Sequence, residues 1–521
     1  MKSFPSKLAQ SLRAPSWLLR SCPAAVITAG VVMLLSLLAA EALEASGGTS
    51  ESWRASTFFI ASALALISYL ASAESKAVGH PWIWGGMLIG TALALLGMTT
   101  VFAEYAVTRV PAGTAADPVA VARILVPGAY DPQIFGTLNA ITVDARRFFL
   151  MDGLIDVWVY VLSKGGFDVV PYELMGVQER GIVYLYALVM HVMGGFNTYY
   201  MVLTNWLAHV LATMVLYAVS KRAFGVKAAA IGAGLYLVFP ENIYWGAMIY
   251  KDEIVVLTVL ASVYSLLKIA QERRQSYYLV FAAAIVGMAF LRSGLVPVMV
   301  CAGLISHAIS GATRLKDLGK YIAVIATTIL GTAFLLPPGI AGDLEQKIIQ
   351  KPYEKLTGGS SAYLDTQSIS YRTSKSESLI ERLGGGDLSV EKISFVPIRI
   401  VFYLISPFPP TRMRFEGDRY ILPSTYLITI LLTFFAVGMY RNAITGGTAV
   451  HLMTTHFILL GLAIAFAGPF VYDRYRLLLT PFFLSIASAV LVTSTWRQRI
   501  MMVSLSGGIW AIAYALWTML R

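Results

Sequence analysis

Long apolar runs recur along almost the whole of this chain, and they constrain its fold more than any other feature. Many of them reach the roughly 20 residues that an α-helix needs to cross a bilayer. Only 13% of the 521 residues are charged, which is about half the fraction typical of a soluble domain. Unbroken runs are also unlike the short alternating strands of a membrane barrel. We therefore predict an all-α polytopic membrane protein.

The apolar runs divide into roughly thirteen expected transmembrane helices. Two further apolar segments, 181–195 and 396–408, are shorter, and we expect each to be a surface or re-entrant helix. The expected spans lie at about 24–43, 55–73, 82–103, 197–219, 228–243, 253–269, 277–292, 294–311, 321–338, 420–439, 449–468, 475–494 and 500–519.

Basic residues gather in the short loops on one side of these spans, as in the turns at 221–227, 268–274 and 314–320. The positive-inside rule makes that side the cytoplasm. The net charge of +11 therefore reflects orientation and is no sign of nucleic-acid binding. The basic N-terminus runs into an apolar segment of full span length, which favours a first transmembrane helix over a cleaved signal peptide. We expect a multi-pass protein with a cytoplasmic N-terminus.

Two long hydrophilic segments, 104–180 and 339–396, then fall on the outer side. Loops of this length inside a compact protein are usually functional or disordered. The chain divides accordingly into N-terminal helices (1–103), a first outer loop (104–180), a helical core (181–338), a second outer loop (339–396) and C-terminal helices (397–521). No internal repeat is visible.

Cysteine and histidine residues give no sign of a metal site or a cofactor. Cys22 and Cys301 lie far apart and are not expected to form a disulfide. The histidines lie in helical segments without ligand spacing. We expect no metal ion and no cofactor.

The first outer loop carries the strongest candidate for a catalytic carboxylate. Asp144 lies beside Arg146 and Arg147, which would keep it ionised and suited to act as a general base. The arginines can instead bind phosphate, or the cluster can be a surface salt bridge. Asp152 and Asp156 are alternative bases, but their spacing places them on one helix face, where a structural role is favoured.

A second polar segment follows Pro240, which should end a span. Tyr244 and Trp245 suit the depth of the membrane interface, and Lys251 precedes the adjacent carboxylates Asp252 and Glu253. The segment can be an aromatic belt followed by a helix with an acidic first turn. It can also bind a lipid phosphate through Lys251 and a sugar through the aromatic and acidic side chains.

Further guanidinium groups lie at the expected outer ends of spans. Arg292 interrupts an apolar hairpin, and a charge at membrane depth should have a partner or a function. Arg474 and Arg476 precede a late span, where they can bind phosphate or reach the interface as snorkelling side chains.

Taken in order, these residues resemble the GT-C superfamily of membrane glycosyltransferases, and in particular the bacterial relatives of protein mannosyltransferases and lipid A aminoarabinose transferases. The resemblance covers about 144–311. It rests on Gly181-x-x-Tyr184-x-Tyr186, the cytoplasmic turn 218–225, the order Pro240–Trp245–Asp252, and a weaker similarity at 473–481 to an Arg-Tyr-x-x-Pro stretch.

The resemblance implies a fold, a reaction and a location in the bacterial inner membrane. The sugar donor would be a polyprenyl phosphate sugar, and the acceptor a glycan, lipid or protein at the periplasmic face. Asp144, matching the acidic residue of the family's first outer loop, would be the base of an inverting transfer. Lys251, Arg292, Arg474 and Arg476 would bind the donor phosphate.

Two other functions stay open from the residues alone. Lys251-Asp252-Glu253 also resembles turns of bacterial polysaccharide polymerases, which join lipid-linked oligosaccharide units. A transporter of lipid-linked glycans is the second alternative. Transporters usually place their polar sites at the midplane between repeated halves, whereas the carboxylates of this chain gather on the outer side.

Overall fold

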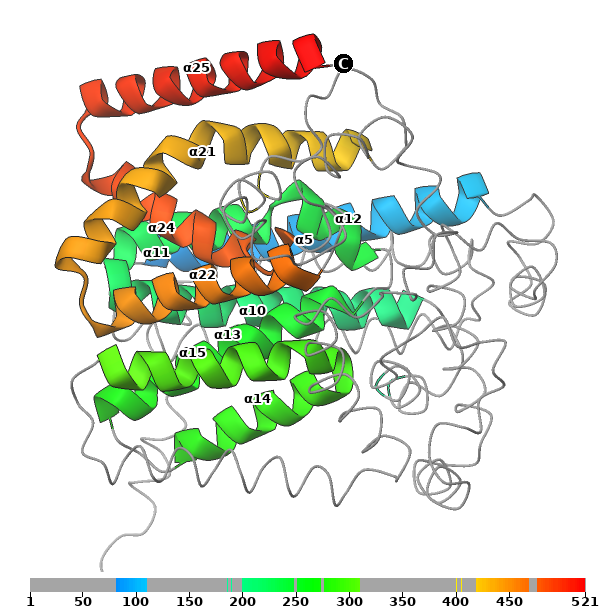
Figure 1. The fold of residues 1–521 in the computed structure, drawn as a ribbon. Coiled ribbons are helices and arrows are strands. Elements are labelled where there is room, and N and C mark those ends of the chain that lie inside the picture. The colour runs from blue at the N-terminus through cyan, green and yellow to red at the C-terminus, as the bar shows by residue number, and fades with distance from the viewer. Residues whose placement is uncertain are drawn as a thin grey trace, which may run out of the picture.

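The computed structural model describes residues 81–109, 185, 189, 199–247, 251–272, 276–309, 400, 404, 418–467 and 476–520. Nearly all of the structure in this part of the chain is helical (Figure 1). The helices are α5 (Pro81–Arg109), α10 (Tyr199–Phe224), α11 (Val226–Leu237), α12 (Pro240–Ala247), α13 (Asp252–Glu272), α14 (Ser276–Arg292), η3 (Ser293–Leu295), α15 (Val296–Ile309), α21 (Asp418–Thr445), α22 (Thr448–Ala467), α24 (Thr480–Thr493) and α25 (Trp496–Leu520).

The expected spans that fall on the described residues all coincide with helices. The spans at 24–43, 55–73 and 321–338 lie outside the described residues, as do the second long loop and the first loop beyond α5. By length and composition, four described helices can cross a membrane: Gly85–Phe102 within α5, Tyr199–Phe224, Asp252–Glu272 and Tyr420–Ile444. These findings establish a helical membrane protein with several spans.

The basic turn between α10 and α11 is a single residue long. Gly225 has φ 84°, a backbone conformation that glycine adopts and other residues adopt only with strain. Its N–H donates to the Lys221 carbonyl at 3.0 Å, and its own carbonyl accepts from Ala229 at 3.1 Å. Both main-chain groups of Gly225 are thus hydrogen-bonded where the chain reverses direction, and α10 and α11 pack against each other.

The expected span at 228–243 is two helices in the structure, not one. α11 ends at Leu237 and α12 begins at Pro240, because proline has no N–H to donate and disfavours helical geometry in the residue before it. The 12 residues of α11 extend about 18 Å. The break after α11 turns the chain toward α5 and α21, against which α12 packs.

Basic side chains and aromatic rings gather at one end of the helix bundle. At this end, the Arg222 guanidinium lies 5.4 Å from the Tyr264 ring centroid, and Lys268 lies near the rings of Tyr264 and Tyr277. Figure 1 shows the turns α10–α11, α21–α22 and α24–α25 at a common end of the bundle. This is the end that the basic residues assign to the cytoplasm.

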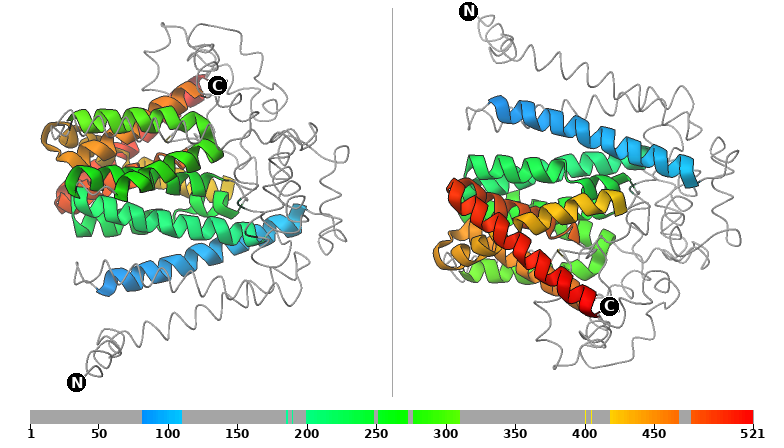
Figure 2. Two further views of the ribbon diagram at one scale, coloured as in Figure 1. Left: turned by 90° about the horizontal axis from the view of Figure 1, so that it is seen from below. Right: turned by 90° about the horizontal axis from the view of Figure 1, so that it is seen from above.

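α5 is part of the packed core although it lies far before α10 in the sequence. Its Thr91 carbonyl accepts a 3.1 Å hydrogen bond from the Trp206 indole, and Thr99 shares a 2.7 Å hydrogen bond with Tyr199. Met98 is fully buried. In Figure 2, α5 runs along one side of the bundle and extends beyond α10.

α25 lies on the outside of the bundle and crosses α21 obliquely (Figure 2). A 2.6 Å hydrogen bond between Thr433 and Ser506 joins the two helices. Large apolar side chains of α25 are exposed, among them Met501 and Ile512. Exposed apolar surface of this kind is expected where a helix faces lipid.

Candidate functional site

The break after α11 places the start of α12 and the start of α13 at the end of the bundle opposite the basic turns. Glu241 lies in the first turn of α12, and Asp252 and Glu253 form the first turn of α13. Negative charge is favoured there, because the free N–H groups of a helix start carry partial positive charge. All three carboxylates are nevertheless almost fully buried, so each needs a specific partner.

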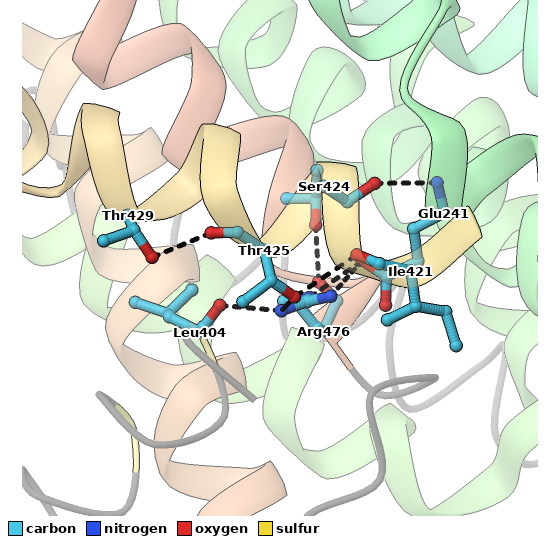
Figure 3. A network of polar contacts seen from close by, with 8 residues as sticks. Glu241, Leu404, Ile421, Ser424, Thr425, Thr429 and Arg476 are labelled. Atoms are coloured by element: carbon cyan, nitrogen blue, oxygen red, sulfur yellow. Dashed lines mark hydrogen bonds and ion pairs between the residues drawn. The ribbon is translucent and has the colours of Figure 1, made fainter. Parts of the chain in front are cut away.

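Glu241 is paired with Arg476, and neither side chain is exposed (Figure 3). Arg476 Nε donates to Glu241 Oε2 at 2.8 Å, and Nη2 lies 2.6 Å from the same oxygen. The carboxylate and the guanidinium neutralise each other in a buried site, where either charge alone would be strongly unfavourable. The pair joins α12 to the turn before α24.

Neighbouring groups complete this network. Arg476 Nη1 donates to the Leu404 carbonyl at 2.8 Å and to Thr425 Oγ1 at 3.2 Å. The Glu241 N–H donates to Ser424 Oγ at 2.8 Å. Figure 3 shows these groups gathered around the guanidinium from α12, α21 and the α24 turn. One arginine therefore fixes the relative positions of helices that are distant in sequence.

Asp252 is paired with Arg292, the last residue of α14. Arg292 Nη1 lies 3.1 Å from Asp252 Oδ1. The arginine side chain is 13% exposed, whereas the aspartate side chain is 2% exposed. The arginine side chain is thus the more exposed member of this pair, and Asp252 holds it from the buried side.

Glu253 points into the bundle and contacts His209 of α10. Glu253 Oε2 lies 3.0 Å from His209 Nδ1, and His209 Nε2 lies 3.0 Å from the Leu237 carbonyl. The Tyr236 hydroxyl donates to Oε2 at 3.5 Å, and its ring packs against the imidazole. Glu253 therefore connects the start of α13 to α10 and to the end of α11.

Aromatic rings and Lys251 lie beside these pairs. Tyr244 stacks on Tyr420 of α21 with ring centroids 5.5 Å apart, and it meets the Trp245 ring edge-on at 5.1 Å. Lys251 is partly buried, and its carbonyl accepts a 3.0 Å hydrogen bond from the Val255 N–H. Lys251 thus caps α13 with its backbone, next to Asp252.

The structure brings most of the residues singled out in the sequence to one end of the bundle. These are Lys251, Asp252, Glu253, Arg292, Arg476, Tyr244 and Trp245. Asp144, Asp152, Asp156 and Arg474 lie outside the described residues. Their roles, and the phosphate-binding roles of the cations, stay predictions.

Two residues of this end were missed by the sequence reasoning. His209 was set aside because it has no partner at metal-ligand spacing, and Glu241 was treated only as part of a turn. Their positions within apolar segments could have revealed them, because an ionisable side chain within an apolar helix needs a partner or a function.

Part of the chain matches the sequence model of a known protein family. Residues 181–336 match the sequence model of the family described as dolichyl-phosphate-mannose-protein mannosyltransferases. The matched segment contains α10 to α15, and therefore the pairs Asp252–Arg292 and His209–Glu253. Comparison with curated protein sequences gives no match.

Among solved structures, the chain is similar to the archaeal oligosaccharyltransferase AglB from Archaeoglobus fulgidus in complex with an inhibitory peptide and a dolichol-phosphate. The identity is 12% and the TM-score 0.46, covering 85% of this chain and 56% of that chain. The Archaeoglobus fulgidus oligosaccharyltransferase tethered to an acceptor peptide containing the NVT sequon gives 12% identity and a TM-score of 0.39, covering 74% of this chain and 54% of that chain.

This chain thus spans about half the length of those oligosaccharyltransferases. The family match, which covers 181–336, is independent of them. Over that segment it confirms the resemblance to the GT-C superfamily of membrane glycosyltransferases.

Proposed function

We propose that this protein is an integral-membrane glycosyltransferase of the bacterial inner membrane that uses a polyprenyl phosphate sugar. It transfers the sugar to a glycan, lipid or protein acceptor at the periplasmic face. The observation that carries the proposal is the match of 181–336 to the dolichyl-phosphate-mannose-protein mannosyltransferase family. The gathering of carboxylates, cations and aromatic rings at one end of this segment supports it.

The chemistry of the donor explains why cations are needed there. When the sugar is transferred, the bond between the anomeric carbon and the phosphate oxygen breaks, and the leaving phosphate gains negative charge. Fixed positive groups stabilise such charge most where water is excluded. Arg292 is the first candidate, because its guanidinium is partly exposed and held by Asp252. Lys251, Arg474 and Arg476 are the others.

The acceptor needs a base. In the proposed step, the acceptor hydroxyl gives its proton to a carboxylate while its oxygen bonds to the anomeric carbon from the side opposite the phosphate, so the configuration inverts. Asp144 is the proposed base, with Asp152 and Asp156 as alternatives. Asp252, Tyr244 and Trp245 are the proposed sugar-binding or positioning groups. The sequence also suggested Glu253, but its carboxyl group contacts His209 inside the bundle.

The test is Asp144→Asn beside Asp152→Asn, each compared with a deletion strain by mass spectrometry of envelope glycans and lipid A. Asn keeps the shape of the side chain and cannot take up the proton. We expect Asp144→Asn to reproduce the glycan lost in the deletion at normal protein level, and Asp152→Asn to match the wild type.

Other results would point elsewhere. A wild-type profile for Asp144→Asn would show that the base is another residue. A deletion that shortens a repeating glycan without removing a single sugar type would favour the polymerase alternative. A deletion that changes no glycan would contradict the transferase itself and favour transport.

A further inference from the structure

The pair His209–Glu253 is a buried pair of titratable groups that the proposed reaction does not use. His209 is 0% exposed and Glu253 is 1% exposed. The pair lies between α10 and the first turn of α13, in contact with the end of α11 through Leu237. Ionisable groups in such a place are rare in membrane proteins, and they usually have a function.

The two contacts of the imidazole ring limit the ways in which protons can be placed on this pair. Both imidazole nitrogens face oxygen atoms at 3.0 Å, one of the Glu253 carboxyl group and one of the Leu237 carbonyl. A neutral imidazole has only one N–H and donates to only one of them. Both contacts are hydrogen bonds if the ring carries two protons, or if a protonated Glu253 donates to Nδ1.

In either arrangement the pair holds one proton more than a neutral ring beside a carboxylate, and its net charge is zero. Zero net charge suits a buried site, because an uncompensated ion there is strongly unfavourable. The Tyr236 hydroxyl is a further titratable group in contact with Glu253. The nearby charges Asp252–Arg292 and Glu241–Arg476 are themselves paired.

We propose that His209 and Glu253 share one proton and together position the phosphate-binding end of α13. The positioning role rests on the proposed function. Glu253 anchors the first turn of α13, Asp252 beside it holds Arg292, and Lys251 precedes both. If the contact between Glu253 and His209 is lost, the first turn of α13 shifts. Lys251 and Arg292, two of the cations proposed to bind the phosphate, then move with it.

The variant Glu253→Gln tests the shared proton separately from the positioning of α13. The glutamine amide donates to Nδ1 of a neutral His209, whose Nε2–H donates to Leu237. This variant therefore keeps both His209 contacts without the shared proton, although the amide nitrogen does not accept the hydrogen bond that the Tyr236 hydroxyl donates in the wild type. Glu253→Ala and His209→Ala remove the contact. His456→Ala is the matched control, because His456 is also fully buried but its imidazole hydrogen-bonds to a carbonyl of its own helix, that of Leu452.

Two measurements on the full chain in lipid nanodiscs test the proposal. The first is the affinity for decaprenyl phosphate, which represents the leaving group of the donor. We expect Glu253→Gln to stay within about twofold of the wild type, and Glu253→Ala and His209→Ala to bind at least roughly tenfold more weakly, which corresponds to about 1.4 kcal/mol. His456→Ala should bind like the wild type.

The second measurement is the midpoint of thermal unfolding at pH 6 to 9. An unfolded histidine releases its proton above about pH 6.5, whereas a folded pair that shares one proton as proposed keeps it. The folded state then binds more protons than the unfolded state, so stability falls as pH rises. We expect this fall to be smaller in Glu253→Gln than in the wild type.

The possible outcomes are distinct. If the unfolding midpoints of the wild type and Glu253→Gln depend on pH in the same way, the proposal that the pair shares a proton is wrong. Tight decaprenyl phosphate binding by Glu253→Ala would overturn the positioning role.

If the alanine variants do not fold, Glu253→Asp takes their place, because it keeps the carboxylate but shortens its reach. If the wild type itself does not bind decaprenyl phosphate, the donor class of the proposed function and the positioning role both fail, and the unfolding curves alone decide on the proton.

Discussion

At the scale of single residues, the three carboxylates in the first turns of α12 and α13 each have a cationic or imidazole partner. Glu241 contacts Arg476, Asp252 contacts Arg292, and Glu253 contacts His209. Burying such a pair costs desolvation energy that the attraction only partly offsets, but removing one partner leaves an isolated charge. The pairs therefore specify which helices meet more than they add to stability.

Replacing Arg476 tests this asymmetry. We expect Arg476→Met to lower the free energy of unfolding by about 3–5 kcal/mol, because Glu241 then stays buried without a counter-charge. The Leu404 carbonyl would also lose its donor. Unfolding in mixed micelles of increasing denaturing detergent measures the change.

The double variant Arg476→Met with Glu241→Leu is the control, because it removes both charges. It should be more stable than Arg476→Met alone by a few kcal/mol, on the order found when buried ion pairs are replaced by apolar groups. A double variant that is less stable than the single one would contradict the view that the unpaired carboxylate causes the loss.

The sequence identified some of these residues but none of their pairings. Asp252 and Arg292 were both marked as site residues, yet their contact depends on how α13 and α14 pack. Arg476 was interpreted as a phosphate ligand or a snorkelling side chain, and nothing near it in the sequence indicates Glu241, which lies 235 residues away. Single-sequence patterns carry local information, whereas a tertiary ion pair is set by packing.

At the scale of helices, the close approach of α11 to α24 depends on a glycine. A Cβ atom at Gly232 would lie 3.1 Å from Ser485 Cα and 3.4 Å from the Leu484 carbonyl. Small residues of this kind let membrane helices approach each other closely. A 2.8 Å hydrogen bond between Ser220 and Ser485 joins α24 to α10 at the same place.

Gly232→Ala and Gly234→Ala form a matched pair on one helix. A Cβ at Gly234 would meet nothing within 4 Å. In a helix interior, alanine is favoured over glycine by about 1 kcal/mol, so Gly234→Ala should be neutral or stabilising. Gly232→Ala should cost roughly 1–3 kcal/mol, because the helices must separate. Thermal unfolding of both variants measures the difference, and equal midpoints would contradict the close contact.

The helices themselves were largely predictable, and their breaks were not. Apolar runs and basic turns located α10 and α13, because length and charge reflect the membrane directly. The break between α11 and α12 was missed, because the run from 228 to 239 is apolar throughout and the expected span was continued past Pro240 to residue 243. In the structure Pro240 begins a new helix instead.

At the scale of the whole molecule, the two ends of the bundle differ in charge and in polar contacts. Gly447 lies between α21 and α22 at the end with the basic turns, and Gly294 lies between α14 and α15 beside Arg292. Both are exposed, and added side chains would meet nothing within 4 Å. The positive-inside rule therefore predicts that Gly447 lies in the cytoplasm and Gly294 outside.

Single cysteines test this orientation in a chain with Cys22 and Cys301 replaced by alanine. We expect a membrane-impermeant maleimide to label Gly294→Cys in intact spheroplasts and Gly447→Cys only after the membrane is opened. The opened membranes serve as the control for reactivity. The reverse pattern would invert the proposed topology and place the proposed site in the cytoplasm.

The pairing of Glu241 with Arg476 has a consequence for how the chain is made. A ribosome completes α12 long before it reaches the turn ahead of α24, because 235 residues separate the two partners. During that interval the carboxylate has no guanidinium, so it must stay in water, stay protonated or be sheltered by the insertion machinery. Final closure of the bundle around α12 therefore waits until residue 476 has been translated, and a chain interrupted before that residue would present quality-control proteases with an unfinished core.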